Sequence, residues 1–141
     1  MNTILEPSIF AKIINREIPA DIVFEDDDVI AFLTIEPINP GHTLVVPKKP
    51  FVNLIDGDDV SLGKMITVAK KIGQALIKSG LATGINLIMN NGADADQEVF
   101  HAHMHVVPRQ KDDQVFVKPT HCLVSAEQTA NIVRQLQTKL L

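Results

Sequence analysis

Three histidines, His101, His103 and His105, occupy every second position in one short stretch of the chain. Apolar residues precede and follow them, a pattern typical of a half-buried strand. Because side chains alternate between the two faces of a strand, we expect the three imidazoles on one face, spaced about 6.6 Å apart. Each buried ring nitrogen needs a hydrogen-bond partner, so packing alone explains three such rings poorly. The spacing therefore predicts a functional site.

Two kinds of chemistry suit imidazoles arranged in this way. The rings can bind a transition metal, since neutral histidine is a common ligand of such metals. Alternatively, one imidazole can attack phosphorus as a nucleophile while its neighbours orient it, transfer protons and hold a phosphate. The other nitrogen of the nucleophile must then donate to a fixed acceptor, so that the attacking nitrogen keeps its lone pair.

The residues around the histidines favour the phosphoryl chemistry. A catalytic zinc site often adds a carboxylate or a cysteine, but the acidic residues between positions 94 and 98 lie in a predicted loop. A phosphate site instead needs polar side chains that converge on the strand, and amides and imidazoles supply donors of this kind. The residues available for this role are Asn90, Asn91, Gln97 and a fourth histidine, His42. Metal binding and non-catalytic binding remain open at this point.

Apolar periodicity and turn residues predict the elements that position the histidines. Strands are expected over residues 22–25, 29–33, 42–47, 85–89 and 99–108. Helices are expected over residues 8–14, 58–79 and 125–140, with Ser8 and Ser125 as N-caps. The long central helix is amphipathic and should cover one face of the sheet. Together these elements predict an α+β fold with an antiparallel sheet and segregated helices.

Length and charge limit the classes of function. A chain of 141 residues is expected to form one domain over residues 1–141. The formal net charge is −4 and no run of lysines or arginines occurs. This argues against a general nucleic-acid-binding surface, because such surfaces neutralise many phosphates. No segment reaches the roughly eighteen consecutive apolar residues of a membrane helix, so we expect no membrane partner.

The amino-terminal segment and the cysteine content indicate the compartment. The first seven residues lack the basic region and the long apolar core of a secretory signal. Cys122 is the only cysteine, which excludes an intrachain disulfide and a cysteine metal knuckle. We therefore expect a cytoplasmic protein.

Residues 101–107 resemble the signature of the histidine triad family, in which three alternating histidines are followed by apolar residues. The similarity continues through residues 8–20, 24–32, 41–48 and 90–109. It implies a single HIT domain, with an antiparallel five-stranded sheet and two main helices. The branch resembled is the small bacterial type that hydrolyses nucleoside phosphoramidates and adenylylated amines. It further implies a purine nucleotide substrate, a homodimer and no cofactor.

The resemblance also implies roles for individual residues. His103 would attack the α-phosphorus, expel an amine and form a nucleotidyl-histidine, which water would then hydrolyse. His101 and His105 would flank it, with the backbone carbonyl near His101 fixing its tautomer and His105 contacting phosphate oxygens, while His42 would complete the cluster. The expected substrate contacts are Asn90, Gln97, Glu98, Thr34, Ile9, Phe10, Ile13, Phe32 and Ile35. The apolar members of this set equally suit a plain hydrophobic core, since clefts and cores share composition.

One departure from the family pattern concerns zinc. Many bacterial members bind zinc through a Cys-x-x-Cys pair near the amino terminus and a histidine after a Pro-Lys pair. The corresponding positions here are Ser8, Ala11 and Pro50. A structural zinc needs four ligands, and one remaining histidine cannot hold it. The sequence therefore predicts no structural zinc.

Two further departures concern the substrate. Thr34 stands where the family usually places an aspartate that accepts both ribose hydroxyls. The absence of that aspartate would weaken ribose binding by about tenfold. Glu36, two positions on, would compensate if the strand stayed regular as far as Pro37. Glu98 stands where close relatives carry a small polar residue near the leaving group. A carboxylate there would favour a cationic amine and disfavour a polyphosphate.

Three alternatives to a phosphoramidate hydrolase remain open. A dinucleoside polyphosphate hydrolase would use the same nucleophile on a P–O–P bond. A non-catalytic nucleotide-binding scaffold would keep the fold while Thr34 weakened catalysis. A metalloprotein would bind an ion through His101, His103 and His105.

Overall fold

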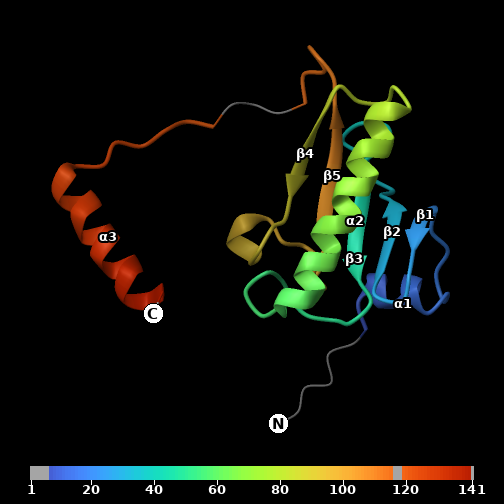
Figure 1. The fold of residues 1–141 in the computed structure, drawn as a ribbon, viewed down its shortest axis with the longest axis horizontal. Coiled ribbons are helices and arrows are strands. Elements are labelled where there is room, and N and C mark those ends of the chain that lie inside the picture. The colour runs from blue at the N-terminus through green and yellow to red at the C-terminus, as the bar shows by residue number, and fades with distance from the viewer. Residues whose placement is uncertain (1–6, 116–118, 141) are drawn as a thin grey trace, which may run out of the picture.

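A five-stranded antiparallel sheet forms the body of the protein in a computed structural model that describes residues 7–115 and 119–140 (Figure 1). The strands are β1 (Ile22–Glu25), β2 (Val29–Leu33), β3 (Thr43–Pro47), β4 (Gly84–Ile88) and β5 (Met104–Arg109). The helices are α1 (Ile9–Ile14), α2 (Asp59–Lys78) and α3 (Ala126–Leu140). The strand order is β1-β2-β3-β5-β4, and every neighbouring pair is antiparallel. The predicted α+β fold with an antiparallel five-stranded sheet is confirmed.

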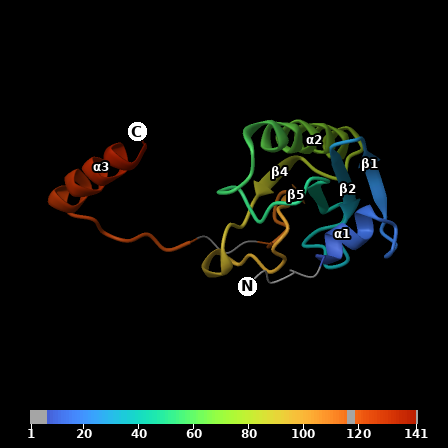
Figure 2. The same ribbon diagram turned by 90° about the horizontal axis from the view of Figure 1, so that it is seen from below.

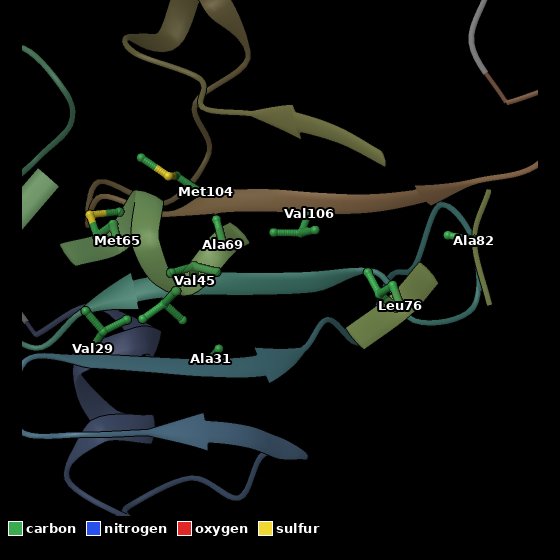
Figure 3. Close-up of a cluster of buried hydrophobic side chains, with 10 residues drawn as sticks. Val29, Ala31, Val45, Met65, Ala69, Leu76, Ala82, Met104 and Val106 are labelled. Atoms are coloured by element: carbon green, nitrogen blue, oxygen red, sulfur yellow. The ribbon is translucent and has the colours of Figure 1, made fainter. Parts of the chain in front are cut away.

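The long helix α2 covers one face of the sheet. Asp58 caps the helix by accepting the backbone N–H of Ser61, and Ser79 follows its last residue. On its inner side, Met65 and Ala69 are almost fully buried. They pack against strand residues that include Val45 and Val106 (Figure 3). The predicted packing of this helix on the sheet is confirmed.

The short helix α1 lies on the opposite side of the sheet from α2, as Figure 2 shows. Its buried residues Phe10 and Ile13 pack against Ile30, Phe32 and Leu44. Neighbouring residues on β2 and β3 point to opposite faces, so both strands are apolar on both sides, as is typical of a sheet covered twice. The helix α1 packs on β2 and β3, and the rings of His101 and His103 lie next to its Phe10.

The carboxy-terminal helix α3 stands apart from the sheet in both views (Figures 1 and 2). Ser125 Oγ accepts the N–H of Gln128, and Gln128 Oε1 accepts the N–H of Ser125, a reciprocal capping box. None of its residues is buried, although Ile132, Val133 and Leu136 form an apolar stripe. Within residues 7–115 and 119–140, no helix is both long and apolar enough to cross a bilayer.

The prediction that all three triad histidines belong to one strand is wrong. Strand β5 begins at Met104, so His101 and His103 precede it and only His105 lies within it. Pro47 has no backbone N–H to extend the ladder, and its carbonyl accepts from the His101 side chain instead. The backbone N–H of Ala102 donates to Phe51 O at 2.8 Å, outside the sheet. Residues 101–103 are therefore held by loop and side-chain hydrogen bonds.

Candidate active site

A cavity of about 750 Å³ opens between α1, the end of β2 and the histidine stretch. His42, His103 and His105 line it, whereas His101 does not. His42 comes directly before β3, where Gly41 has a φ of 97°, a conformation that favours glycine. A Cβ on Gly41 would also lie 2.9 Å from Leu76 Cδ2 of the long helix. The turn that aims His42 at β5 therefore needs a glycine.

His103 presents one unprotonated nitrogen to the cavity. Its Nδ1 lies 2.8 Å from the carbonyl oxygen of His101. A carbonyl can only accept, so Nδ1 carries the proton and Nε2 of the neutral ring keeps its lone pair. Burial lowers the pKa of His103, while the hydrogen bond to His101 opposes that shift. The ring of Phe10 packs edge-on at 4.9 Å between centroids and holds the imidazole from the side of α1.

His105 presents a donor to the same cavity. The backbone N–H of Ile38 donates to His42 Nδ1 at 3.1 Å, so the neutral His42 ring carries its proton on Nε2. That Nε2 lies 2.9 Å from His105 Nδ1 and donates to it. The neutral His105 ring therefore carries its own proton on Nε2. Burial first, and then the nearby His103 and His42, lower the pKa of His105 to about 4.

The arrangement of His103 and His105 suits attack on an anionic electrophile. Their ring centroids are 5.1 Å apart. One ring offers a lone pair and the other an N–H donor, and burial favours the neutral form of both. A phosphoryl group bound between them would meet a nucleophile on phosphorus and a hydrogen bond on oxygen.

His101 lies behind the cavity and is 3% exposed. Its Nε2 lies 2.9 Å from Pro47 O, and its Nδ1 lies 2.8 Å from Ser8 Oγ. Both ring nitrogens are therefore used inside the protein. Its contribution to the cavity is the backbone carbonyl that orients His103.

All five predicted apolar wall residues line the cavity: Ile9, Phe10, Ile13, Phe32 and Ile35. Phe10, Ile13 and Phe32 also belong to the buried cluster under the sheet, while Ile35 is 91% exposed. Phe10, Ile13 and Phe32 thus belong both to the hydrophobic core and to the cavity wall.

The predicted polar contacts divide into two groups. Thr34, Asn90 and Glu98 line the cavity, and so does Glu36. Gln97 does not, because its buried amide is used within the loop. Its Oε1 accepts from the Gly92 N–H and from Asn53, and its Nε2 donates to the carbonyls of Val52 and Val99. Gln97 therefore shapes the loop that carries Asn90 and Glu98 and stays outside the cavity.

Sequence reasoning missed several lining residues, among them Leu44, Asp96 and Val99. Leu44 follows His42 by two positions, so strand periodicity alone places both on one face. Asp96 and Val99 lie in an irregular segment that carries no such signal. Ser8 was predicted as a helix cap, but its contact with His101 joins residues 93 positions apart.

Comparison with known proteins yields one family and several relatives. The sequence model described as HIT domain matches residues 15–112. A purine nucleoside phosphoramidase of Escherichia coli K12 is 47% identical over 106 residues, covering 72% of this chain and 87% of that protein. A crystal structure from Streptococcus mutans UA159 is 33% identical and superposes with a TM-score of 0.90, covering 100% of this chain and 90% of that one. A zinc-bound histidine triad family protein from Mycobacterium smegmatis is 34% identical, with a TM-score of 0.75 and 94% of each chain covered.

The residues present here do not fit a structural zinc next to His101. Such a site needs four nitrogen, sulfur or carboxylate ligands, and the side chains of Ala11 and Pro50 have none to offer. The Ser8 hydroxyl and both ring nitrogens of His101 are already engaged in hydrogen bonds. In the part of the chain that the structure describes, no group of three or more His, Cys, Asp or Glu side chains is placed to hold a metal ion.

Proposed function

This chain belongs to the HIT domain family, and from that premise we propose that it hydrolyses nucleoside 5′-phosphoramidates or adenylylated amines. The observation that carries the proposal is the pair of fixed tautomers in the cavity. His103 offers the Nε2 lone pair and His105 offers the Nε2–H. The name of the E. coli relative, purine nucleoside phosphoramidase, supports the same chemistry and a purine base.

The reaction proceeds in two displacements at phosphorus. His103 Nε2 attacks the α-phosphorus, the P–N bond breaks, and the amine departs with a proton taken from solvent. Positive charge grows on the His103 ring during attack and is stabilised by the carbonyl of His101. His105 Nε2–H donates to a phosphoryl oxygen. Water then attacks phosphorus and breaks its bond to Nε2. The hydroxyl of the water stays on phosphorus, and the remaining proton returns to solvent and replaces the one that the amine took.

Intact-mass measurement after incubation with adenosine 5′-phosphoramidate tests this proposal. We expect a transient adduct one adenylyl group heavier than the chain, absent in His103→Ala. His121→Ala is the matched control, since His121 is exposed and lies outside the cavity. Nucleotide binding without adduct or turnover in the intact chain would contradict the proposal and favour the non-catalytic scaffold. Loss of activity on treatment with a chelator would favour the metalloprotein.

The charge of the cavity supports an amine as the leaving group. Asp21, Glu36, Asp96 and Glu98 line it, and no lysine or arginine does so among the described residues. A polyphosphate leaving group would meet these carboxylates with unfavourable charge, whereas a protonated amine substituent would meet them favourably. We therefore prefer the phosphoramidate to the dinucleoside polyphosphate as substrate.

A ratio of rates tests the leaving-group preference. We expect kcat/KM for an adenylylated lysine to exceed that for diadenosine polyphosphate, and Glu98→Ser to reduce the ratio. Ser61→Ala, at a position outside the cavity, is the control. An unchanged ratio in Glu98→Ser would remove Glu98 from the specificity determinants.

We further propose an isologous homodimer built on α2 and β4. An apolar groove lies between these elements, lined by Ile66, Ala69, Lys70, Gly73, Gln74, Ile77, Ile85 and Leu87. Strand β4 stands last in the sheet order, so one of its edges has no strand partner within the described sheet. An exposed edge and an apolar groove side by side favour burial against a second copy.

Two broader expectations remain proposals. We propose that residues 1–141 act as a single domain, in which α3 is an appendage of the sheet. We also propose a cytoplasmic location, supported by the free, exposed Cys122, because reduced thiols are typical of that compartment.

A further inference from the structure

One hydroxyl group connects the helix that walls the cavity to the residue that orients the nucleophile. Ser8 Oγ accepts the backbone N–H of Ala11, in the first turn of α1, at 3.0 Å. The same oxygen lies 2.8 Å from His101 Nδ1. Ser8 is thus the N-cap of α1 and at the same time a partner of the buried imidazole.

The donor and the acceptor of each hydrogen bond between Ser8, His101 and Pro47 can be assigned. Pro47 O can only accept, so His101 Nε2, 2.9 Å away, carries the ring proton. The neutral ring then has its lone pair on Nδ1, and Ser8 must donate its hydroxyl hydrogen to it. Ser8 can do so because its oxygen accepts only from Ala11. The hydroxyl therefore holds His101 as the Nε2–H tautomer.

The position of the His101 ring bears directly on His103. Residues 101–103 lie outside the β3–β5 ladder, so strand pairing does not fix them. The His101 carbonyl nevertheless has to stay 2.8 Å from His103 Nδ1 to keep the nucleophile in its attacking tautomer. The anchors of this segment are the Ala102–Phe51 backbone bond and the two bonds of the His101 ring.

The same contact links α1 to the catalytic rings. Phe10 follows Ser8 on α1, and its ring lies 6.0 Å from the His101 ring and 4.9 Å from the His103 ring, both edge-on. Phe10 also lines the cavity. Ser8 therefore connects two parts of the site through its hydrogen bonds. One is the helix whose side chains would contact a nucleobase, and the other is the residue whose carbonyl orients the nucleophile.

We propose that Ser8 is a positioning residue for hydrolysis, because its hydroxyl proton locks the His101 tautomer and so holds the carbonyl that orients His103. This role is distinct from capping α1, which needs only an acceptor oxygen. It rests on the proposed function of His103 as nucleophile.

Three substitutions separate the two roles of Ser8. Thr supplies both a cap and a donor, Asp caps as well as Ser but has no proton to donate, and Ala supplies neither. We expect Ser8→Thr to retain kcat and the thermal midpoint of unfolding. Ser8→Asp should keep the thermal midpoint while kcat falls about five- to tenfold, because a doubly protonated His101 opposes the positive charge that develops on His103, with a smaller change in KM. Ser8→Ala should lose both.

The imidazole tautomers provide a readout independent of turnover. Long-range ¹⁵N–¹H NMR spectra of the wild-type chain should show His101 protonated on Nε2 and His103 on Nδ1. In Ser8→Asp, His101 should gain a second proton on Nδ1 at neutral pH, whereas Ser8→Thr should match the wild type.

The outcomes distinguish this proposal from the proposed function. Wild-type kcat and wild-type tautomers in Ser8→Asp would reduce Ser8 to a helix cap and overturn the proposal. Altered tautomers in Ser8→Asp together with no turnover in any chain, wild type included, would instead reject the hydrolase and leave the hold of Ser8 on His101 intact.

Discussion

The four clustered histidines divide into different chemical groups once their hydrogen bonds are traced. His103 keeps a lone pair for the cavity, His105 keeps a proton for it, and His42 fixes the tautomer of His105. Both ring nitrogens of His101 form hydrogen bonds within the protein. The hydrogen-bond partners of the ring nitrogens thus give these four histidines separate roles.

The pH dependence of hydrolysis should reflect burial of the nucleophile. Attack requires neutral His103, and burial lowers its pKa below the ordinary 6.5, so the neutral form persists to lower pH. We expect kcat/KM to be level at weakly alkaline pH, to fall as the pH drops, and to reach half its maximum below pH 6.5. Single-turnover rates across this range check the prediction, with His121→Gln as a control that should give the same profile. A half-maximal rate at or above pH 6.5 would contradict it.

Replacing Thr34 by aspartate should tighten nucleotide binding. Thr34 lines the cavity and its hydroxyl accepts the N–H of Glu36, so it offers ribose only a neutral group. A carboxylate there adds a charged hydrogen bond, and we expect the Kd for a purine monophosphate to fall about tenfold. Calorimetric titration measures the change. If Thr34→Asp left the Kd unaltered while Glu36→Gln raised it, the sugar contact would belong to Glu36.

At the level of helices and strands, sequence periodicity predicted every main element and missed where one of them begins. Strands β1 to β4 and all three helices lie within a residue or two of their predicted ranges, because each has a clear apolar pattern or cap. The start of β5 could not be found in this way, since alternation continues through His101 and His103 although pairing does not. That boundary depends on Pro47 and Phe51, which are distant in sequence.

The same limit applies to the candidate site. The histidines and the apolar wall could be predicted from spacing and resemblance, and the cavity contains the wall residues together with His42, His103 and His105. The inward fold of Gln97 and the contact between Ser8 and His101 could not, because both depend on which loops meet. Local patterns therefore identify the reactive side chains more readily than the groups that hold them.

Truncation of Met65 should destabilise the fold without altering the chemistry. Met65 on α2 is fully buried against the sheet, on the face opposite α1 and the cavity. We expect Met65→Ala to lower the free energy of unfolding by about 2–5 kcal/mol, measured by urea titration. Thr67→Ala, at an exposed position on the same helix, should change it by less than about 0.5 kcal/mol. A drop in kcat of the folded Met65→Ala protein would contradict the separation of the two faces.

At the scale of the whole molecule, the groove between α2 and β4 should determine the oligomeric state. Ile77 and Leu87 line it and are 50% and 43% exposed. Light scattering of the wild-type chain should give twice its mass of 15.5 kDa. The double variant Ile77→Asp, Leu87→Asp should give the single mass, because paired carboxylates in an apolar interface are strongly unfavourable. Ile55→Asp, at an exposed loop position outside the groove, is the control; a monomeric wild type would refute the dimer.

The separation of α3 from the sheet has a practical consequence for experiments. Cys122, the chain's only cysteine, is exposed, lies shortly before this helix and does not line the cavity. A maleimide fluorophore would attach at that one point, beyond the end of β5 and with no engineered mutation. Its anisotropy would then report how freely the helical appendage tumbles, and whether nucleotide or assembly slows it.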